Sequence, residues 1–257
     1  MNRDWTSFGL KDQIAIITGA SQGIGRTLAI ALAQAGADIA LVSRTRSDLE
    51  AVAKEIEAAD RKALVIPVDL QNVSQIRKMV DAVHTTFGKI DILVNNAAWT
   101  ATVEALEATE EEWDQTLDTS LKAVFFACQA VAKIMIQQDR GKIVNIGSTL
   151  GRTAFATRSV YGAAKAGVHH LTRVLALEWA AKGINVNAVA PCVTETPTRR
   201  KLFERPGYKE WATGQMLPVG RWAQPEDFVG ATLFLCSSLS DMVVGHVLMV
   251  DGGWTIH

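Results

Sequence analysis

The sequence predicts an α/β fold in which helices cover both faces of a doubly wound parallel sheet, giving three layers in the order α/β/α. Two observations lead to this prediction. Short apolar runs alternate with longer amphipathic segments along the chain, which is typical of βαβ units with right-handed crossovers. A glycine-rich turn also joins the first apolar run to the first amphipathic segment. No linker, repeat or charge block divides the 257 residues, so we expect a single domain.

The short apolar runs are the predicted strands, and they cover residues 14–18, 38–43, 63–68, 91–95, 142–146, 184–190 and 246–250. The amphipathic segments are the predicted helices, at residues 26–35, 47–59, 73–87, 110–138 (with a break around Thr119), 160–182 and 225–237. Residues 194–217 are irregular and polar. We interpret them as a lid, because binding loops in such folds follow the strand ends.

The composition excludes several classes of function. Lysine and arginine total 26 against 27 aspartate and glutamate, so the formal net charge is −1 and gives no bulk attraction for nucleic acid or an anionic membrane. The most apolar stretch, residues 124–136, is interrupted by Gln129 and Lys133, so we expect no membrane span. The first residues lack the apolar core of a signal peptide.

The cysteines and histidines show no pattern typical of a disulfide framework or a metal site. Cys128, Cys192 and Cys236 are widely spread and without C-x-x-C spacing. The neighbours His169 and His170 diverge on a helix and have no carboxylate at ligand spacing. We therefore expect no metal and a reducing, cytoplasmic location.

The glycine-rich turn, residues 18–25, lies between the first predicted strand and the first helix and has the spacing G-x-x-x-G-x-G. Glycines at such a turn let the backbone approach a pyrophosphate, and the helix N-terminus offers unpaired N–H groups to the anion. Glycine turns also connect strands to helices for purely structural reasons. The strand–turn–helix context favours nucleotide binding.

Tyr161 and Lys165 lie four residues apart on a predicted helix, so both side chains point to the same face. An unperturbed phenol is a poor acid–base catalyst at neutral pH, and a nearby ammonium favours its ionised form. The alternative is an ordinary amphipathic helix that carries both residues on its surface. Ser148, just past the fifth strand, has a hydroxyl that can polarise a substrate carbonyl, although alone it is a loop serine.

Together these residues resemble the short-chain dehydrogenase/reductase family over nearly the whole chain. Further matches are Asp69 after the third strand, N-N-A at residues 95–97, N-A-V-A-P ending at Pro191, Thr196, and V-D-G-G at residues 250–253. Segments 7–11, 220–227 and 245–251 are similar to the sugar-acid (gluconate-type) branch. The resemblance implies a Rossmann-type sheet, a nicotinamide coenzyme and hydride transfer between a ketone and a secondary alcohol. It also implies a homotetramer, with a coenzyme half at about 10–120 and a catalytic half at about 121–257.

The resemblance assigns roles residue by residue. Tyr161 is the general acid/base, Lys165 assists it and holds the nicotinamide ribose, and Ser148 orients the substrate oxygen. Asn95 and Ala97 flank the adenosine-side ribose, and Asp69 the adenine. Val193 and Thr196 hold the carboxamide. The remaining implied coenzyme residues are Gly19, Ser21, Gln22, Gly23, Ile24, Gly25, Leu70 and Pro191.

Three positions depart from the family pattern. Ala98 replaces a glycine beside the coenzyme cleft, and Cys192 replaces the glycine after Pro191, where we expect an apolar filler rather than a reactive thiol. Ser120 stands where the family has the asparagine of its proton relay. We therefore expect a weakened or rerouted relay.

Coenzyme preference is encoded at the end of the second strand. Relatives that prefer NAD carry an acidic residue there, whereas this chain has Ser43 and Arg44 and no carboxylate before Asp48. A hydroxyl and a guanidinium suit the 2′-phosphate of NADP(H). The alternative is a solvated arginine at a strand end.

The substrate is less clearly encoded. The lid contains Arg199, Arg200, Lys201 and Arg205, which can meet an anion, but Glu195, Glu204 and Glu210 are interleaved and favour a solvated helix. Trp99, Leu150, Phe155 and Trp211 are candidates for an apolar wall. The predicted function is an NADP(H)-dependent oxidoreductase of sugar acids, polyols, or cyclic or hydroxy ketones. The alternatives are a 3-oxoacyl thioester reductase and a catalytically idle NADP-binding sensor or scaffold.

Overall fold

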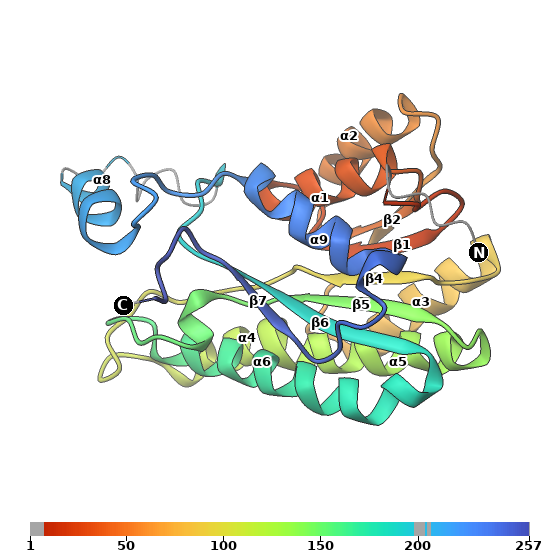
Figure 1. Ribbon diagram of the computed structural model, residues 1–257. Helices are drawn as coiled ribbons and strands as arrows, with labels where there is room; N and C mark the ends of the chain where they lie inside the picture. Colours follow the sequence, from red (N-terminus) through yellow and green to blue (C-terminus); the bar gives the residue numbers. More distant parts are fainter. Residues whose placement is uncertain (1–7, 198–203, 205–206, 257) are drawn as a thin grey trace.

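The computed structural model describes residues 8–197, 204 and 207–256, and its centre is one seven-stranded sheet (Figure 1). All neighbouring strands are parallel, in the spatial order β3-β2-β1-β4-β5-β6-β7. Their bounds are β1 Ile14–Thr18, β2 Asp38–Ser43, β3 Ala63–Pro67, β4 Ile92–Asn95, β5 Gly141–Ile146, β6 Ile184–Pro191 and β7 Val247–Val250. The predicted doubly wound parallel sheet is confirmed, and its order reverses between β1 and β4.

Helices cover both faces of the sheet. One face carries α1 Gly23–Gln34, α2 Arg46–Glu57 and α9 Val229–Cys236, and the other carries α3 Val73–Phe87, α5 Ala123–Gln137 and α6 Ser159–Trp179 (Figure 1). The short helical segments are Thr149–Gly151, Ala180–Lys182, α8 Tyr208–Trp211, Ala212–Met216, Pro225–Phe228 and Ser238–Ser240. The predicted last helix thus begins with a 3₁₀ turn.

Helix α4 Glu110–Leu117 continues into α5 through the π-helical turn Asp118–Lys122. The break predicted around Thr119 is therefore a change of helical winding, and the chain does not leave the helix. Such π turns are rare and occur frequently at functional sites.

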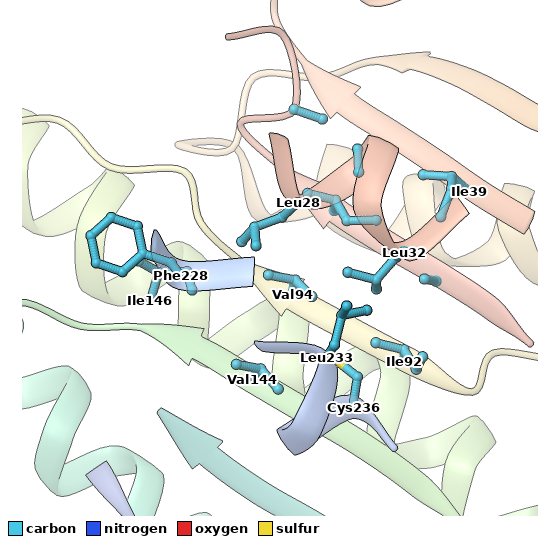
Figure 2. Close-up of a cluster of buried hydrophobic side chains, with 14 of the residues drawn as sticks. Leu28, Leu32, Ile39, Ile92, Val94, Val144, Ile146, Phe228, Leu233 and Cys236 are labelled. Carbon is cyan, nitrogen blue, oxygen red and sulfur yellow. The ribbon is translucent and has the colours of Figure 1, made fainter. Parts of the chain in front are cut away.

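An apolar core on each face fixes the helices to the sheet. Figure 2 shows Leu28 of α1 and Leu233 of α9 packed toward Ile92 and Val94 of β4. Leu93, between them, faces the other core, because successive strand residues point to opposite faces. Both faces of the strands are buried, which explains their nearly continuous apolar sequences.

The helical run Glu110–Gln137 is the one candidate membrane span, by length and composition alone, in the part of the chain that the structure describes. In the fold, Val124, Ala127, Val131 and Met135 of this run are buried in the core beneath the sheet. Packing in this core accounts for the apolar residues on the buried side of the run.

The first two residues of the segment predicted as a lid, Thr194 and Glu195, are held by hydrogen bonds to residues 222–224. Thr194 forms a parallel bridge with Ala223, and the Glu195 carboxylate accepts hydrogen bonds from Trp222 Nε1 (3.0 Å) and Gln224 Nε2 (2.8 Å). The basic residues predicted in the lid, Arg199, Arg200, Lys201 and Arg205, lie outside the described residues. A lid function stays a prediction.

Candidate active site

Two adjoining pockets lie at the carboxyl edge of the sheet. Ile24, Asn96, Ala98 and Thr196 line both, so the pockets form one continuous cleft. Most predicted coenzyme residues line the first pocket: Gly19, Ser21, Gln22, Gly23, Ile24, Ser43, Arg44, Asp69, Leu70, Ala97 and Thr196. The predicted catalytic residues line the second pocket with two further coenzyme candidates, giving Ser148, Tyr161, Lys165, Pro191 and Val193. We call these the coenzyme pocket and the substrate pocket.

The turn between β1 and α1 shapes the coenzyme pocket through its backbone. Gly19 and Gly23 have φ angles of 66° and 54°, which favour glycine. A Cβ on Gly25 would lie 2.2 Å from the Gly19 carbonyl oxygen, so Gly25 permits a close backbone approach without lining the pocket itself. Helix α1 begins here with no side-chain cap, which leaves its first N–H groups to bind a phosphate.

The loop after β4 is held against this turn. The Thr18 hydroxyl accepts hydrogen bonds from the backbone N–H groups of Asn96 (3.0 Å) and Ala97 (3.1 Å). Asn95 points elsewhere: its side chain donates to Asn145 Oδ1 (2.9 Å) inside the sheet, and it lines neither pocket. Asn95 therefore ties β4 to β5, and its predicted contact with the coenzyme ribose has no support in this geometry.

The end of β2 presents an unsatisfied hydroxyl to the coenzyme pocket. Ser43 Oγ is buried and has no hydrogen-bond partner among the described residues. An unsatisfied buried hydroxyl is costly, so a ligand acceptor at this point would stabilise it. The exposed Arg44 beside it has no recorded ion pair in the described structure, whereas Arg46 pairs with Glu50. These residues fit the ribose end of NADP(H), although Asp48 lines the same pocket and opposes a phosphate.

Helix α6 brings Tyr161 and Lys165 to the substrate pocket opposite Ser148. The Lys165 ammonium lies 5.6 Å from the centre of the Tyr161 ring and donates to the Ile146 carbonyl at the end of β5 (2.6 Å). Both side chains are nearly buried. Ser148 Oγ accepts from the Leu150 N–H (3.2 Å), which leaves its own proton for a substrate oxygen.

His169, one turn beyond Lys165 on α6, contacts the backbone of the segment that carries Ser148. Its Nε2 accepts a hydrogen bond from the Ser148 N–H (3.4 Å). Gly147 and Gly151 leave room for the ring, since a Cβ on either would lie within 2.6 Å of an imidazole atom. Burial, together with the positive charges of Lys165 and Arg173, lowers the pKa of His169 to about 4. The imidazole is therefore a neutral acceptor at neutral pH.

Ser120, in the π turn, is engaged by the loop after β4. Its buried Oγ donates to the Trp99 carbonyl (2.9 Å) and accepts from the Trp99 N–H (3.1 Å). Trp99 in turn lines the coenzyme pocket. Ser120 thus fixes this loop, and a weakened or rerouted proton relay stays a prediction.

Cys192 lines the substrate pocket. Burial and the nearby Asp251 carboxylate raise the pKa of its thiol to about 11. A thiol in this state is a poor nucleophile at neutral pH, which favours the predicted filler over a reactive cysteine. Burial likewise raises the pKa of Cys128 and of Cys236 to about 12.

The predicted apolar wall is only partly assembled in the substrate pocket. Leu150 and Phe155 line it, Trp99 lines the coenzyme pocket, and Trp211 packs on Phe155 with ring centres 5.7 Å apart. Among the lining residues that sequence reasoning missed, three have large side chains: Arg158, Tyr208 and Trp254. None belongs to a recognisable motif, and the nearest signal was the position of Arg158 three residues before Tyr161.

Comparison with known proteins places the chain in a family. Residues 19–255 match a family model described as enoyl-(acyl carrier protein) reductase. The chain is 39% identical to 2-dehydro-3-deoxy-D-gluconate 5-dehydrogenase of Escherichia coli K12 over 97% of this chain and 98% of the relative. It is 37% identical to D-threitol dehydrogenase of Mycolicibacterium smegmatis (97% and 95%) and to 3-oxoacyl-(acyl-carrier-protein) reductase of Thermotoga maritima (96% and 99%).

Solved structures of similar fold lead to the same family. A short-chain type dehydrogenase/reductase from Mycobacterium marinum superposes with a TM-score of 0.92 at 36% identity, covering 97% of this chain and 98% of that one. A gluconate 5-dehydrogenase from Burkholderia cenocepacia J2315, solved in complex with NADP and tartrate, gives a TM-score of 0.93 at 36% identity with the same coverage.

A doubly wound parallel sheet with a cleft at its carboxyl edge is typical of dinucleotide-binding proteins. The chain belongs to the short-chain dehydrogenase/reductase family, and it is an enzyme acting on CH–OH groups.

Proposed function

We propose that the protein is an NADP(H)-dependent dehydrogenase that interconverts a ketone and a secondary alcohol on a sugar acid, polyol or related hydroxy ketone. The observation that carries this proposal is the continuity of the two pockets. Residues that suit a nucleotide and residues that suit acid–base chemistry line one cleft and share four wall residues. The unsatisfied Ser43 hydroxyl beside Arg44 supports NADP(H) over NAD(H).

The chain's own residues account for the proton and the orientation of the substrate. Tyr161 gives a proton to the substrate oxygen in reduction and takes it back in oxidation, and the Lys165 ammonium lies 5.6 Å from the centre of its ring. The Ser148 hydroxyl donates to the same oxygen and fixes its position. When a nicotinamide coenzyme occupies the coenzyme pocket, hydride transfer is the chemistry that it would supply.

The oligomeric state and the cellular location of the protein are also part of the proposal. Several large apolar side chains are strongly exposed on the single chain, among them Leu106, Leu177, Met242 and Ile256. We propose a homo-oligomer, with a homotetramer as the family-based prediction, in which such exposed groups are available for contacts with other copies. A cytoplasmic location is the prediction from the cysteine pattern.

Steady-state assays test the proposed function. The purified protein is tested with sugar acids, polyols, hydroxy ketones and a 3-oxoacyl thioester, with each coenzyme, by following coenzyme absorbance. We expect turnover with a hydroxylated substrate and a preference for NADP(H). A preference for the thioester would support a fatty-acyl reductase. Coenzyme binding without turnover on any substrate would support the idle binding protein.

A further inference from the structure

We propose that His169 is a positioning residue for catalysis, which holds the backbone of Ser148 so that the serine hydroxyl meets the substrate oxygen. The inference rests on the proposed function, because Ser148 acts in that reaction. Tyr161, Lys165 and His169 follow one another at intervals of four residues on one face of α6. The first two line the substrate pocket, whereas His169 lines neither pocket of the described structure and acts through Ser148.

Two consecutive turns of α6 hold the segment that carries Ser148. Lys165 Nζ donates a hydrogen bond to the Ile146 carbonyl (2.6 Å) at the end of β5. One turn later, His169 Nε2 accepts a hydrogen bond from the Ser148 N–H (3.4 Å). The second hydrogen bond is long, so packing of the imidazole against the segment has to supply part of the constraint.

The backbone around Ser148 leaves a space that the imidazole fills. A Cβ on Gly147 would overlap with His169 Nε2, and a Cβ on Gly151 would lie 2.6 Å from His169 Cε1. These two glycines, before and after Ser148, therefore let the ring pack directly against the peptide groups of the segment. Only 4% of His169 is exposed, so its ring has little room to move away.

The charge state of His169 suits this role. Burial, together with the positive charges of Lys165 and Arg173, lowers the pKa of the imidazole to about 4. A neutral imidazole keeps one nitrogen as an acceptor, whereas a protonated ring has donors only. The surroundings that lower the pKa therefore also preserve the hydrogen bond from the Ser148 N–H at neutral pH.

The contact with His169 ties the Ser148 turn to the helix that carries Tyr161. Within the turn, Ser148 Oγ accepts from the Leu150 N–H (3.2 Å), and the Ser148 carbonyl accepts from the Gly151 N–H (3.0 Å). These hydrogen bonds fix the turn internally but not its place relative to α6. Misplacement of a reacting group by about 1 Å can lower a rate by about 100-fold, so the tie matters for turnover.

A double-mutant cycle separates positioning from folding. His169→Leu removes the acceptor and keeps an apolar side chain, and His169→Gln places an amide oxygen near the position of Nε2. His170→Gln is the matched control, because His170 is the exposed neighbour on α6. Each variant is made alone and together with Ser148→Ala. The kcat for oxidation of D-gluconate and of D-threitol and the Kd for NADP⁺ are then measured.

We expect His169→Leu to lower kcat by about 10- to 100-fold with an unchanged Kd for NADP⁺, and His169→Gln to recover most of the loss. When Ser148→Ala is present, His169→Leu should change kcat by no more than about twofold, because no hydroxyl is left to position. His170→Gln should match the unmodified protein. An equal loss with and without the Ser148 hydroxyl, or full activity of His169→Leu, would overturn the proposal.

Hydrogen–deuterium exchange of peptides covering residues 147–151, in the NADP⁺ complex, gives a readout that does not depend on turnover. Exchange should be about 10-fold faster in His169→Leu and unchanged in His169→Gln. Unchanged exchange in His169→Leu contradicts the proposal. If His169→Leu does not fold, Gly147→Ala takes its place, because the added Cβ displaces the ring from the other side. If the unmodified protein oxidises no alcohol while exchange rises in His169→Leu, the proposed function fails and the hold of His169 on Ser148 stands.

Discussion

The coenzyme pocket and the substrate pocket share an edge of the sheet but are built differently. The coenzyme pocket depends on the backbone, through the positive φ angles of Gly19 and Gly23 and the tight approach at Gly25. The substrate pocket depends on side chains from distant segments, among them Arg158 and Trp254. Backbone geometry leaves glycine spacings in the sequence, whereas a wall of dispersed side chains leaves no motif. The two pockets should therefore respond separately to substitution.

The largest effect is expected in the substrate pocket. Tyr161→Phe removes the proton donor, so kcat should fall by about 100- to 10,000-fold while the Kd for NADPH stays nearly unchanged. Steady-state kinetics and fluorescence titration of NADPH measure the two quantities. The chain's other tyrosine provides the control: Tyr208→Phe removes a phenol from the same wall and should cost far less turnover. A Tyr161→Phe enzyme that keeps half of its activity would exclude the mechanism.

The next largest effect is expected at the far end of the coenzyme pocket. Arg44→Ala should weaken NADPH binding by about 10- to 150-fold and leave NADH nearly unaffected, because only NADPH carries the 2′-phosphate. Adding Ser43→Asp should invert the preference, since a carboxylate repels the phosphate and accepts from the ribose hydroxyls. Arg46→Ala, which removes an exposed arginine paired with Glu50, is the matched control. If the unmodified protein already uses NADH as efficiently as NADPH, Arg44 is only a solvated residue.

A smaller effect is expected from His169, whose imidazole accepts a hydrogen bond from the Ser148 N–H. The pKa of His169 is lowered from 6.5 to about 4 in the fold, so the unfolded chain binds more protons between these values and stability falls as pH falls. The neutral His169 imidazole contributes fully to the free energy of unfolding at pH values above its pKa in the unfolded chain. About 2 kcal/mol of this contribution should be lost between about pH 7 and pH 5. Chemical denaturation at both pH values measures it.

Two variants isolate this contribution. His169→Gln cannot be protonated and should show a correspondingly smaller loss of stability on acidification, while its amide oxygen can still accept from the Ser148 N–H. His170→Gln, on the exposed neighbour, should behave like the unmodified protein. An unchanged pH dependence in His169→Gln would mean that other groups cause it.

The smallest effect on turnover is expected at Ser120. Ser120→Ala removes both hydrogen bonds to Trp99, so stability should fall by about 1–3 kcal/mol while kcat changes little. Ser120→Asn should be tolerated less well, because the position is fully buried and the longer side chain displaces the Trp99 loop. A collapse of kcat in Ser120→Ala with the fold intact would show that the hydroxyl carries protons after all.

The sequence was sufficient for the fold and for most of the cleft. Alternating apolar runs located the strands of the sheet, because buried parallel strands must be apolar on both faces. Asn95 was harder to place, since sequence does not show which face of β4 an asparagine occupies, and its side chain bonds to Asn145 within the sheet. Arg158 and His169 were missed because their roles depend on contacts with segments distant in sequence, at Thr100 and Ser148.

Transfer of label from the coenzyme to the product tests the central claim most directly. NADPH carrying deuterium at the transferable position of its nicotinamide is incubated with the protein and a hydroxy ketone, and the product is examined by mass spectrometry. The proposed function predicts deuterium on the carbinol carbon, at a rate at least about 100-fold lower in Tyr161→Phe. Tight binding of NADPH without label in the product of any ketone tested would contradict it.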